Sequence, residues 1–145
     1  MIVYADTSAL VKLFVEEENS DKTRAMLNQA QAMGTGLLTH AELGAALARG
    51  ARLGFLSESE SLEARKRLAT AWHTWIHVLI DENLIGRAEE LAWVHALRGH
   101  DAVHLASALA WQTGIDAPVV LATFDQELWQ AAKVAGLESW PEGGI

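Results

Sequence analysis

Short apolar runs alternate along the chain with longer segments in which apolar residues recur at helical spacing. Most of the short runs are rich in residues that favour strands, so they predict buried strands. These runs are Ile2–Ala5, Gly36–Thr39, His77–Ile80 and Val119–Ala122, and Leu137–Trp140 predicts a further edge strand. Strands that alternate with helices are typical of α/β domains. The pattern therefore predicts an α/β fold with a central, mainly parallel sheet.

The longer segments between these runs combine strong helix formers with residues that begin or end helices. Ser57 and Glu60 form the Ser-x-x-Glu pattern of a capping box at the start of one segment. The predicted helices are Ser20–Met33, Ser57 to about Trp75, Glu82–Leu97, His100–Trp111 and Asp125–Val134. No internal repeat, low-complexity tract or linker interrupts the pattern, so we expect residues 1–145 to form a single domain.

The composition excludes several classes of protein. The formal net charge is −8 and 50% of the 145 residues are hydrophobic, so the chain is neither a strongly basic nucleic-acid coat nor disordered. It has no cysteine, which excludes disulfides, thiol catalysis and cysteine-ligated zinc. The N-terminus does not look like a signal peptide, and no apolar run approaches the roughly 20 residues that span a bilayer. We therefore expect a cytoplasmic protein without a membrane partner.

Four acidic residues lie where the predicted fold would gather them. Asp6 follows the first strand directly, Glu42 lies three residues after the second, and Asp125 lies three residues after Ala122. Asp101 opens the helix that leads into the strand with Val119 and Val120. Ligands of parallel α/β sheets bind beyond the carboxyl ends of the strands. The spacing therefore predicts that all four carboxylates reach one edge of the sheet.

Each acid also has a purely structural interpretation. Asp6 and Asp125 can cap helices, Glu42 can complete a capping box with Thr39, and Asp101 suits a first helical turn. Four like charges in one cleft repel one another, however, unless a cation compensates them. Carboxylates and water are the ligands that Mg²⁺ and Mn²⁺ prefer, so a divalent metal site is the functional alternative.

Four ordered segments carry a resemblance to a known family. They are Ala5-Asp6-Thr7-Ser8-Ala9-Leu10, Thr39-His40-Ala41-Glu42-Leu43, His100-Asp101-Ala102-Val103-His104-Leu105-Ala106 and Leu121-Ala122-Thr123-Phe124-Asp125. In order and spacing the chain resembles the PIN-domain ribonucleases, and among them the VapC-type toxins of toxin–antitoxin pairs. The match extends over almost the whole chain.

The resemblance implies a three-layer α/β/α sandwich, a homodimer, and a small antitoxin protein that blocks the site. It implies that the catalytic acids are Asp6, Glu42, Asp101 and Asp125, with supporting roles for Thr7, Ser8 and Thr123. The leading hypothesis is a metal-dependent endoribonuclease that hydrolyses RNA phosphodiester bonds. In it, Asp6 and Asp101 hold Mg²⁺ or Mn²⁺, while Glu42 and Asp125 complete the shell or orient water.

Positive charge is scarce, and two arginines are the candidates for holding the RNA backbone. Arg98 immediately precedes the Asp101 helix, and Arg49 lies on the helix that begins near Glu42. Both could steer a phosphate towards an acidic cleft. The alternative is that each belongs to a solvated helical face. Lys12 also lies close enough to Asp6 in the sequence to reach the site.

The histidines and tryptophans allow further interpretations. His100 and His104 resemble the His-Glu-x-x-His zinc motif with Asp101 in the glutamate position, but Asp is one methylene shorter. We instead expect His104 to pack on the inner side of its helix and His100 to flank the acidic pocket. The six tryptophans predict core packing or a dimer face, with Trp72 and Trp75 as the interface candidates.

Two other functions use the same kind of pocket. A receiver-like, Mg²⁺-binding switch module would need a phosphate-accepting aspartate after the third strand, where Asp81 lies, but Asp6 has no acidic neighbour. A non-catalytic relative would keep the fold with vestigial acids and would bind nucleic acid or a partner.

Overall fold

The computed structural model describes residues 1–145, and its centre is a five-stranded sheet in which every neighbouring pair is parallel. The strand order is β3-β2-β1-β4-β5. The strands are β1 (Ile2–Ala5), β2 (Ala32–Gly36), β3 (Ile76–Val78), β4 (Val119–Ala122) and β5 (Glu138–Trp140). Because β1 is the middle strand, the first residues of the chain pair with segments that follow much later.

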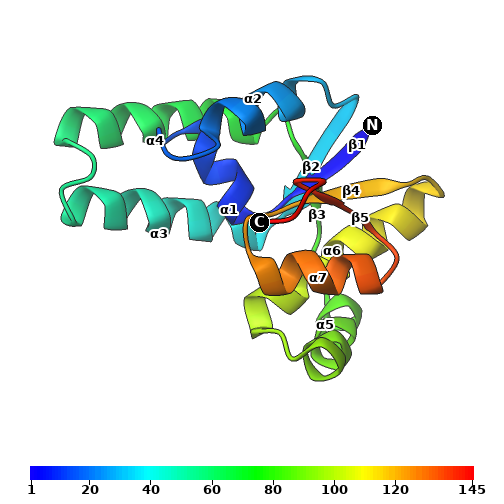
Figure 1. The fold of residues 1–145 in the computed structure, drawn as a ribbon. Helices are drawn as coiled ribbons and strands as arrows, with labels where there is room; N and C mark the ends of the chain where they lie inside the picture. Colours follow the sequence, from blue (N-terminus) through cyan, green and yellow to red (C-terminus); the bar gives the residue numbers. More distant parts are fainter.

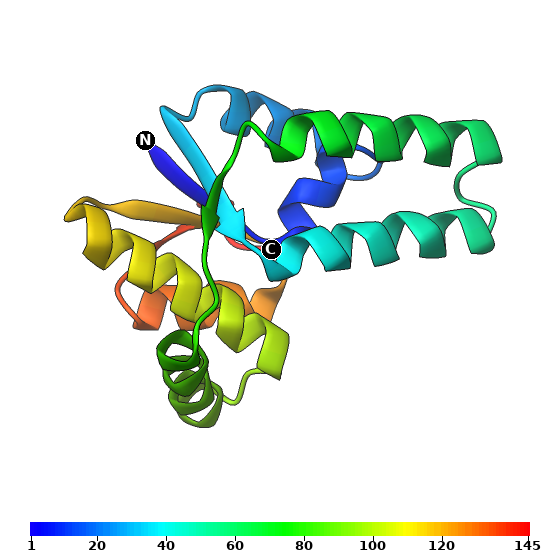
Figure 2. The ribbon, with the colours of Figure 1, turned by 180° about the vertical axis from the view of Figure 1, so that it is seen from behind.

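Helices cover both faces of this sheet, as Figures 1 and 2 show from opposite sides. On one face lie α1 (Thr7–Leu10), the short 3-10 helix Val11–Leu13, α2 (Ser20–Asn28), α3 (Leu38–Arg52) and α4 (Glu58–Trp72). On the other lie α5 (Glu82–His95), α6 (Gly99–Ile115) and α7 (Gln126–Val134). Helices α3 and α4 run side by side and extend beyond the sheet (Figure 1). The three-layer α/β/α arrangement is therefore confirmed.

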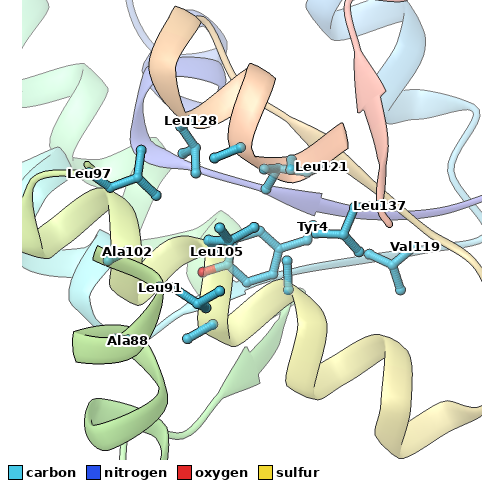
Figure 3. Packing of buried hydrophobic residues seen from close by; sticks show 14 of the residues in the cluster. Tyr4, Ala88, Leu91, Leu97, Ala102, Leu105, Val119, Leu121, Leu128 and Leu137 are labelled. Atoms are coloured by element: carbon cyan, nitrogen blue, oxygen red, sulfur yellow. The ribbon is translucent and has the colours of Figure 1, made fainter. Parts of the chain in front are cut away.

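The alternation of side chains along the strands divides the interior into two apolar cores. Val3 and Ala5 pack under the helices of the first face, whereas Tyr4 points into the opposite core. Figure 3 shows Tyr4 among Leu105, Leu121 and the other aliphatic side chains of that core. A polar hydroxyl is thus buried beneath the sheet, and its partners lead to the candidate site.

The second strand differs from the prediction. We expected Gly36–Thr39, but the strand is Ala32–Gly36, and Thr39 already lies in α3. In the sequence its glycines indicate the end of a helix, but in the structure they lie in the strand where other groups pack closely against the backbone. A Cβ at Gly34 would lie 2.7 Å from the Trp111 ring, and one at Gly36 would lie 2.9 Å from the Tyr4 hydroxyl oxygen. Glycine is therefore favoured in this strand because neighbouring groups approach its backbone closely.

The five listed helices are all present, as α2, α4, α5, α6 and α7, but they differ from the prediction at several ends. Helix α2 ends at Asn28 rather than Met33, because the residues that follow form β2. Helix α6 continues to Ile115, beyond Gly114. The capping box at Ser57 is confirmed: its hydroxyl accepts from Glu60 N at 3.2 Å, and its N–H donates to the Glu60 carboxylate at 2.7 Å.

The strand order decides against the receiver-like alternative. Receiver domains have the order 2-1-3-4-5, whereas here β1 lies between β2 and β4. In addition, the Asp81 side chain caps α5 by accepting a hydrogen bond from Leu84 N at 2.8 Å. In the observed order the direction of winding reverses between β1 and β4. Ligands of open α/β sheets bind beside such a reversal, at the carboxyl ends of the two strands.

The tryptophan prediction needs a correction. Trp72 and Trp75 are buried in the core beneath α4, so they are not interface residues. Trp72 stacks between the rings of His40 and His77, with centroid distances of 4.2 Å on both sides. Trp93 on α5 is the exposed tryptophan, with 87% of its surface accessible. None of the helices has the length and apolar character needed to cross a membrane.

Candidate active site

Asp6 and Asp125 lie side by side at the reversal point of the sheet. Asp6 follows β1 and caps α1, with Oδ1 accepting from Ala9 N at 2.9 Å. Asp125 follows β4 and caps α7, with Oδ1 accepting from Leu128 N at 2.9 Å. The predicted capping roles are therefore both real. They occupy only one oxygen of each carboxylate, which leaves Oδ2 for a second function.

Two hydroxyls hold the second oxygen of Asp6. Thr123 Oγ1 donates to Oδ2 at 2.6 Å, and Ser8 Oγ lies 2.7 Å from Oδ1 and 3.0 Å from Oδ2. Ser8 Oγ and Thr123 Oγ1 also accept from the backbone N–H groups of Phe124 and Asp125. Burial raises the pKa of Asp6, while His104 and these hydrogen bonds oppose that increase. The hydroxyls thus tie the segments after β1 and β4 into one unit.

Arg98 joins the third and fourth acids. Its Nε donates to Asp101 Oδ2 at 2.8 Å, and its Nη2 donates to Asp125 Oδ2 at 2.6 Å. Asp101 is buried in the first turn of α6, whereas the Arg98 side chain is 58% exposed. His100 also approaches Asp101, with Nε2 3.4 Å from Oδ1. A solvent-accessible cation therefore neutralises two carboxylates whose positions are fixed by the fold.

Glu42 enters the site from the second turn of α3, six residues after β2 rather than three. It does not form the predicted capping box with Thr39, because Leu37 is the N-cap and the Thr39 hydroxyl bonds Thr35 Oγ1 at 2.7 Å. Instead Glu42 Oε2 accepts from the Thr7 hydroxyl and lies 2.8 Å from His104 Nε2. Burial acts to raise the pKa of Glu42, but these two partners outweigh it and lower the pKa.

His104 is central among the acids. Burial acts to lower its pKa, but the hydrogen bond to Glu42 and the charges of Asp6, Glu42 and Asp101 raise it. Its Nδ1 lies 3.0 Å from the Tyr4 hydroxyl, so both ring nitrogens have protein partners. The zinc-motif interpretation is therefore wrong, since neither nitrogen is free to bind a metal. His100, in contrast, flanks the acids at the surface.

The other predicted cations lie away from the acids. Arg49 is exposed on α3, two turns beyond Glu42, and forms no ion pair. Lys12 is buried and donates to Glu17 Oε1 at 2.6 Å and to the Glu18 carbonyl at 2.9 Å. Of the positively charged side chains singled out in the sequence, Arg98 alone contacts the acidic residues.

The donor chemistry of the site fits a hard divalent cation. The available atoms are carboxylate and hydroxyl oxygens, which suit Mg²⁺ or Mn²⁺. No three acidic or histidine side chains converge closely enough to enclose a metal ion. Mg²⁺ does not need such an enclosure, because one or two carboxylates and several waters suffice. Asp6 and Asp101 remain the predicted pair for this role.

The comparisons with known proteins agree with this architecture. Residues 3–134 match the PIN domain, which is most of the chain. The chain belongs to the PIN domain family. PIN domains are typically nucleases and are generally metal-dependent. A comparison with curated protein sequences found no match.

Several solved structures superpose on most of the chain at low sequence identity. A protein of Pyrobaculum aerophilum gives a TM-score of 0.69 at 22% identity, covering 96% of this chain and 83% of its own. The sarcin–ricin-loop-cleaving toxin VapC20 of Mycobacterium tuberculosis gives 0.67 at 14% identity, with 93% and 95% covered. The toxin–antitoxin complex of Klebsiella pneumoniae gives 0.56 at 19% identity, with 81% and 83% covered. At these identities the likeness establishes the fold that the PIN domain shares with such toxins.

Sequence reasoning placed His104 inside but did not find its contacts. Its partners, Glu42 and Tyr4, lie 62 and 100 residues earlier in the sequence. One local signal was present, because His104 lies one helical turn after Asp101 and so faces the same side of α6. Tyr4 carried no comparable signal, since an aromatic residue in a buried strand predicts ordinary core packing.

Proposed function

We propose that this PIN domain is a metal-dependent endoribonuclease and the toxin of a toxin–antitoxin pair. The observation that carries the proposal is the position of Asp6 and Asp125 at the reversal between β1 and β4, with Arg98 linking Asp125 to Asp101. Buried or fixed carboxylates at a ligand-binding edge of the sheet fit the binding of a cation and a phosphate. The fold shared with a toxin that cleaves the sarcin–ricin loop supports RNA as the substrate.

The chain's own residues have distinct roles in this proposal. Asp6 and Asp101 would hold Mg²⁺ or Mn²⁺, which when bound neutralises charge on the phosphate and lowers the pKa of water. Thr123 and Ser8 keep the Asp6 carboxylate in place, and Thr7 does the same for Glu42. Glu42 and Asp125 complete the acidic shell and orient water beside the scissile phosphate.

Arg98 has a role that follows from its exposure. Its guanidinium pairs with Asp101 and Asp125 but remains open to solvent on its outer side. A phosphate oxygen is a strong acceptor for arginine donors, so an incoming RNA can compete for the same side chain. We propose that Arg98 transfers from the acids to the RNA backbone when substrate binds. Arg49, on the exposed part of α3, would contact the backbone farther along.

Two protein partners complete the proposal. One is an antitoxin that covers the acidic edge, which is supported by the toxin–antitoxin complex of Klebsiella pneumoniae with the same fold. The other is a second copy of the chain. Exposed Trp93, Val94 and Leu79 lie beside a groove of about 1320 Å³ next to α5. Its rim carries both Arg87 and Glu89, so two copies related by a twofold axis can pair opposite charges. We place the protein in the cytoplasm.

The first experiment is cleavage of a pool of structured RNAs by purified protein in Mg²⁺, Mn²⁺ or EDTA. We expect cutting that requires metal and falls to background in Asp6→Asn and in Asp101→Asn. Unchanged cutting in both variants would refute the acidic site. Binding of RNA without cutting, in the presence of metal, would support the non-catalytic alternative.

The matched control is Asp81→Asn. Asp81 caps α5 as Asp6 caps α1, through the same kind of backbone hydrogen bond, but it lies outside the acidic site. Asparagine is about as good a helix cap as aspartate, so both substitutions preserve capping. We expect full activity in Asp81→Asn, which separates loss of the site from a general effect on helix ends or on contaminating nucleases.

A further inference from the structure

A chain of hydrogen bonds runs from the core beneath the sheet to the acidic edge. It begins at Tyr4, which is fully buried, and passes through His104, of which 2% is exposed. The Tyr4 hydroxyl lies 3.0 Å from His104 Nδ1, and His104 Nε2 lies 2.8 Å from Glu42 Oε2. Neither Tyr4 nor His104 is among the residues assigned to metal, phosphate or RNA in the proposed function.

We propose that Tyr4 and His104 are positioning residues that lock the Glu42 carboxylate in its working orientation. The inference rests on the proposed function and deepens it, because it assigns the support of one acid to a buried pair. A carboxylate only accepts hydrogen bonds, so His104 Nε2 must carry the proton of that contact. Tyr4, bound to the opposite nitrogen, prevents the imidazole from turning away.

The division of the Glu42 oxygens supports this assignment. Thr7 and His104 both donate to Oε2, so this oxygen is held from two sides. Oε1 accepts no hydrogen bond from the protein. It is nevertheless not a buried, unpaired atom, because the one buried side-chain polar atom without a partner is His77 Nε2. Oε1 is therefore accessible to solvent. One oxygen therefore anchors the side chain, and the other faces the solvent of the site. A carboxylate held in this way presents the same oxygen in every molecule.

The packing around Tyr4 shows that its hydroxyl has a dedicated space. A Cβ at Gly36 would lie 2.9 Å from the Tyr4 oxygen and 3.5 Å from Ser107 Oγ. The absence of a side chain in β2 at this point lets the hydroxyl reach α6. Partners behind functional side chains that fix their orientation commonly contribute about 10- to 100-fold to activity.

Two substitutions of His104 separate positioning from simple core packing. In His104→Gln the terminal amide occupies the place of Nε2 and can still donate to Glu42. In His104→Asn the amide occupies the place of Nδ1 and meets Tyr4 but cannot reach Glu42. Both variants keep a neutral polar group in the same cavity, so each serves as the other's control. We expect His104→Gln to keep kcat within a few-fold, and His104→Asn to lose about tenfold or more in kcat with KM little changed.

Crystal structures and melting curves of the same variants make the test independent of activity. We expect Glu42 Oε2 to stay beside residue 104 in His104→Gln and to leave it in His104→Asn, at similar Tm. Equal kcat in the two variants, or an unmoved Glu42 in His104→Asn, would overturn the proposal. If the wild-type protein cuts no RNA, the proposed function fails, whereas the position of Glu42 still decides the positioning role.

Tyr4→Phe tests the second member of the pair. It removes one oxygen from the core and leaves the aromatic packing in place. We expect a several-fold loss of kcat with KM unchanged, because the imidazole keeps one hydrogen bond instead of two. An unchanged kcat, with the His104 ring in its original orientation in the crystal, would exclude Tyr4 from the positioning role.

Discussion

The Asp6 carboxyl group lies where little water reaches it. Only 3% of the residue is exposed, and burial raises its pKa above the ordinary value for aspartate. A folded-state pKa above the unfolded one means that ionisation of Asp6 costs stability. The cost is absent below the unfolded pKa, grows as the pH rises, and is complete above the folded pKa. At neutral pH Asp6 therefore lowers the free energy of unfolding.

Asp6→Asn should consequently raise the Tm of metal-free protein at pH 7.5 by roughly 3–5 °C, which corresponds to about 1 kcal/mol. The helix cap survives, and the hydroxyls of Ser8 and Thr123 can rotate to accept from the new amide. The difference from wild type should close as the pH falls towards about 4. Thermal unfolding followed by circular dichroism in EDTA measures it. A Tm lowered at every pH would show that the lost hydrogen bonds outweigh the removed charge.

Arg98 provides a second test at the level of a single side chain. Arg98→Ala leaves Asp101 buried without its main cationic partner, and it removes the donor proposed for the RNA phosphate. We expect KM for RNA to rise by about tenfold, and the salt dependence of binding to become shallower. Filter binding and cleavage at several salt concentrations measure both quantities. Arg24→Ala, which breaks surface pairs with Glu16 and Asp21, is the control and should change neither.

At the scale of elements, strand β2 shows how packing can override a local signal. Its two glycines weaken it as a strand in isolation, but they admit the Trp111 ring and the Tyr4 hydroxyl. The strand β1 could be predicted from the sequence, because its four apolar residues lead directly into a helix cap. The strand β2 could not be predicted in the same way, since the groups that require glycine lie on α6 and β1, far away in the sequence. For the same reason Glu42 lies six residues after the end of β2 rather than three, because β2 ends at Gly36 and not at Thr39.

Gly34→Ala tests this interpretation of β2. Its new methyl group would lie 2.7 and 2.8 Å from Trp111 ring atoms and 3.1 Å from the Ile76 carbonyl oxygen, so the ring must move. We expect a loss of about 1–3 kcal/mol in the free energy of unfolding. Gly86→Ala is the matched control, because Gly86 is exposed on α5 and an added Cβ would meet no atom within 4 Å, so this variant should gain about 0.5–1 kcal/mol. Urea unfolding of both variants separates the two outcomes.

At the scale of the whole molecule, the chain pattern predicted the parallel sheet and four acids near one edge of it, and the family resemblance implied the three layers. It could not predict the links among them. Arg98 reaches Asp125 across 27 residues, and His104 reaches Glu42 across 62. Such contacts depend on which strands become neighbours. The same limit applies to the tryptophans, where burial of Trp72 and exposure of Trp93 follow from helix packing rather than from local pattern.

The proposed association of two copies has its test on α5. Trp93→Glu places a charge in the middle of the exposed apolar residues, so it should shift the protein from dimer to monomer at micromolar concentration. Sedimentation equilibrium measures the change. Phe55→Glu, at the exposed end of the α3–α4 pair, should leave the association unchanged. Equal dimer content in wild type and Trp93→Glu would exclude this face as the contact.

The central place of β1 in the sheet has a consequence for synthesis. Strand β1 is synthesised first, but it pairs with its second neighbour only once β4 has been made. Only then can the backbone N–H of Asp6 donate to the Ala122 carbonyl. The pairing of β4 with β1 also brings Thr123 and Asp125 next to Asp6 and Ser8. A nascent chain halted before Val119 should therefore be harmless to the RNA around it. Ribosome-bound chains arrested on either side of β4, assayed for RNA cutting, would show whether the proposed nuclease activity is absent until β4 has been synthesised.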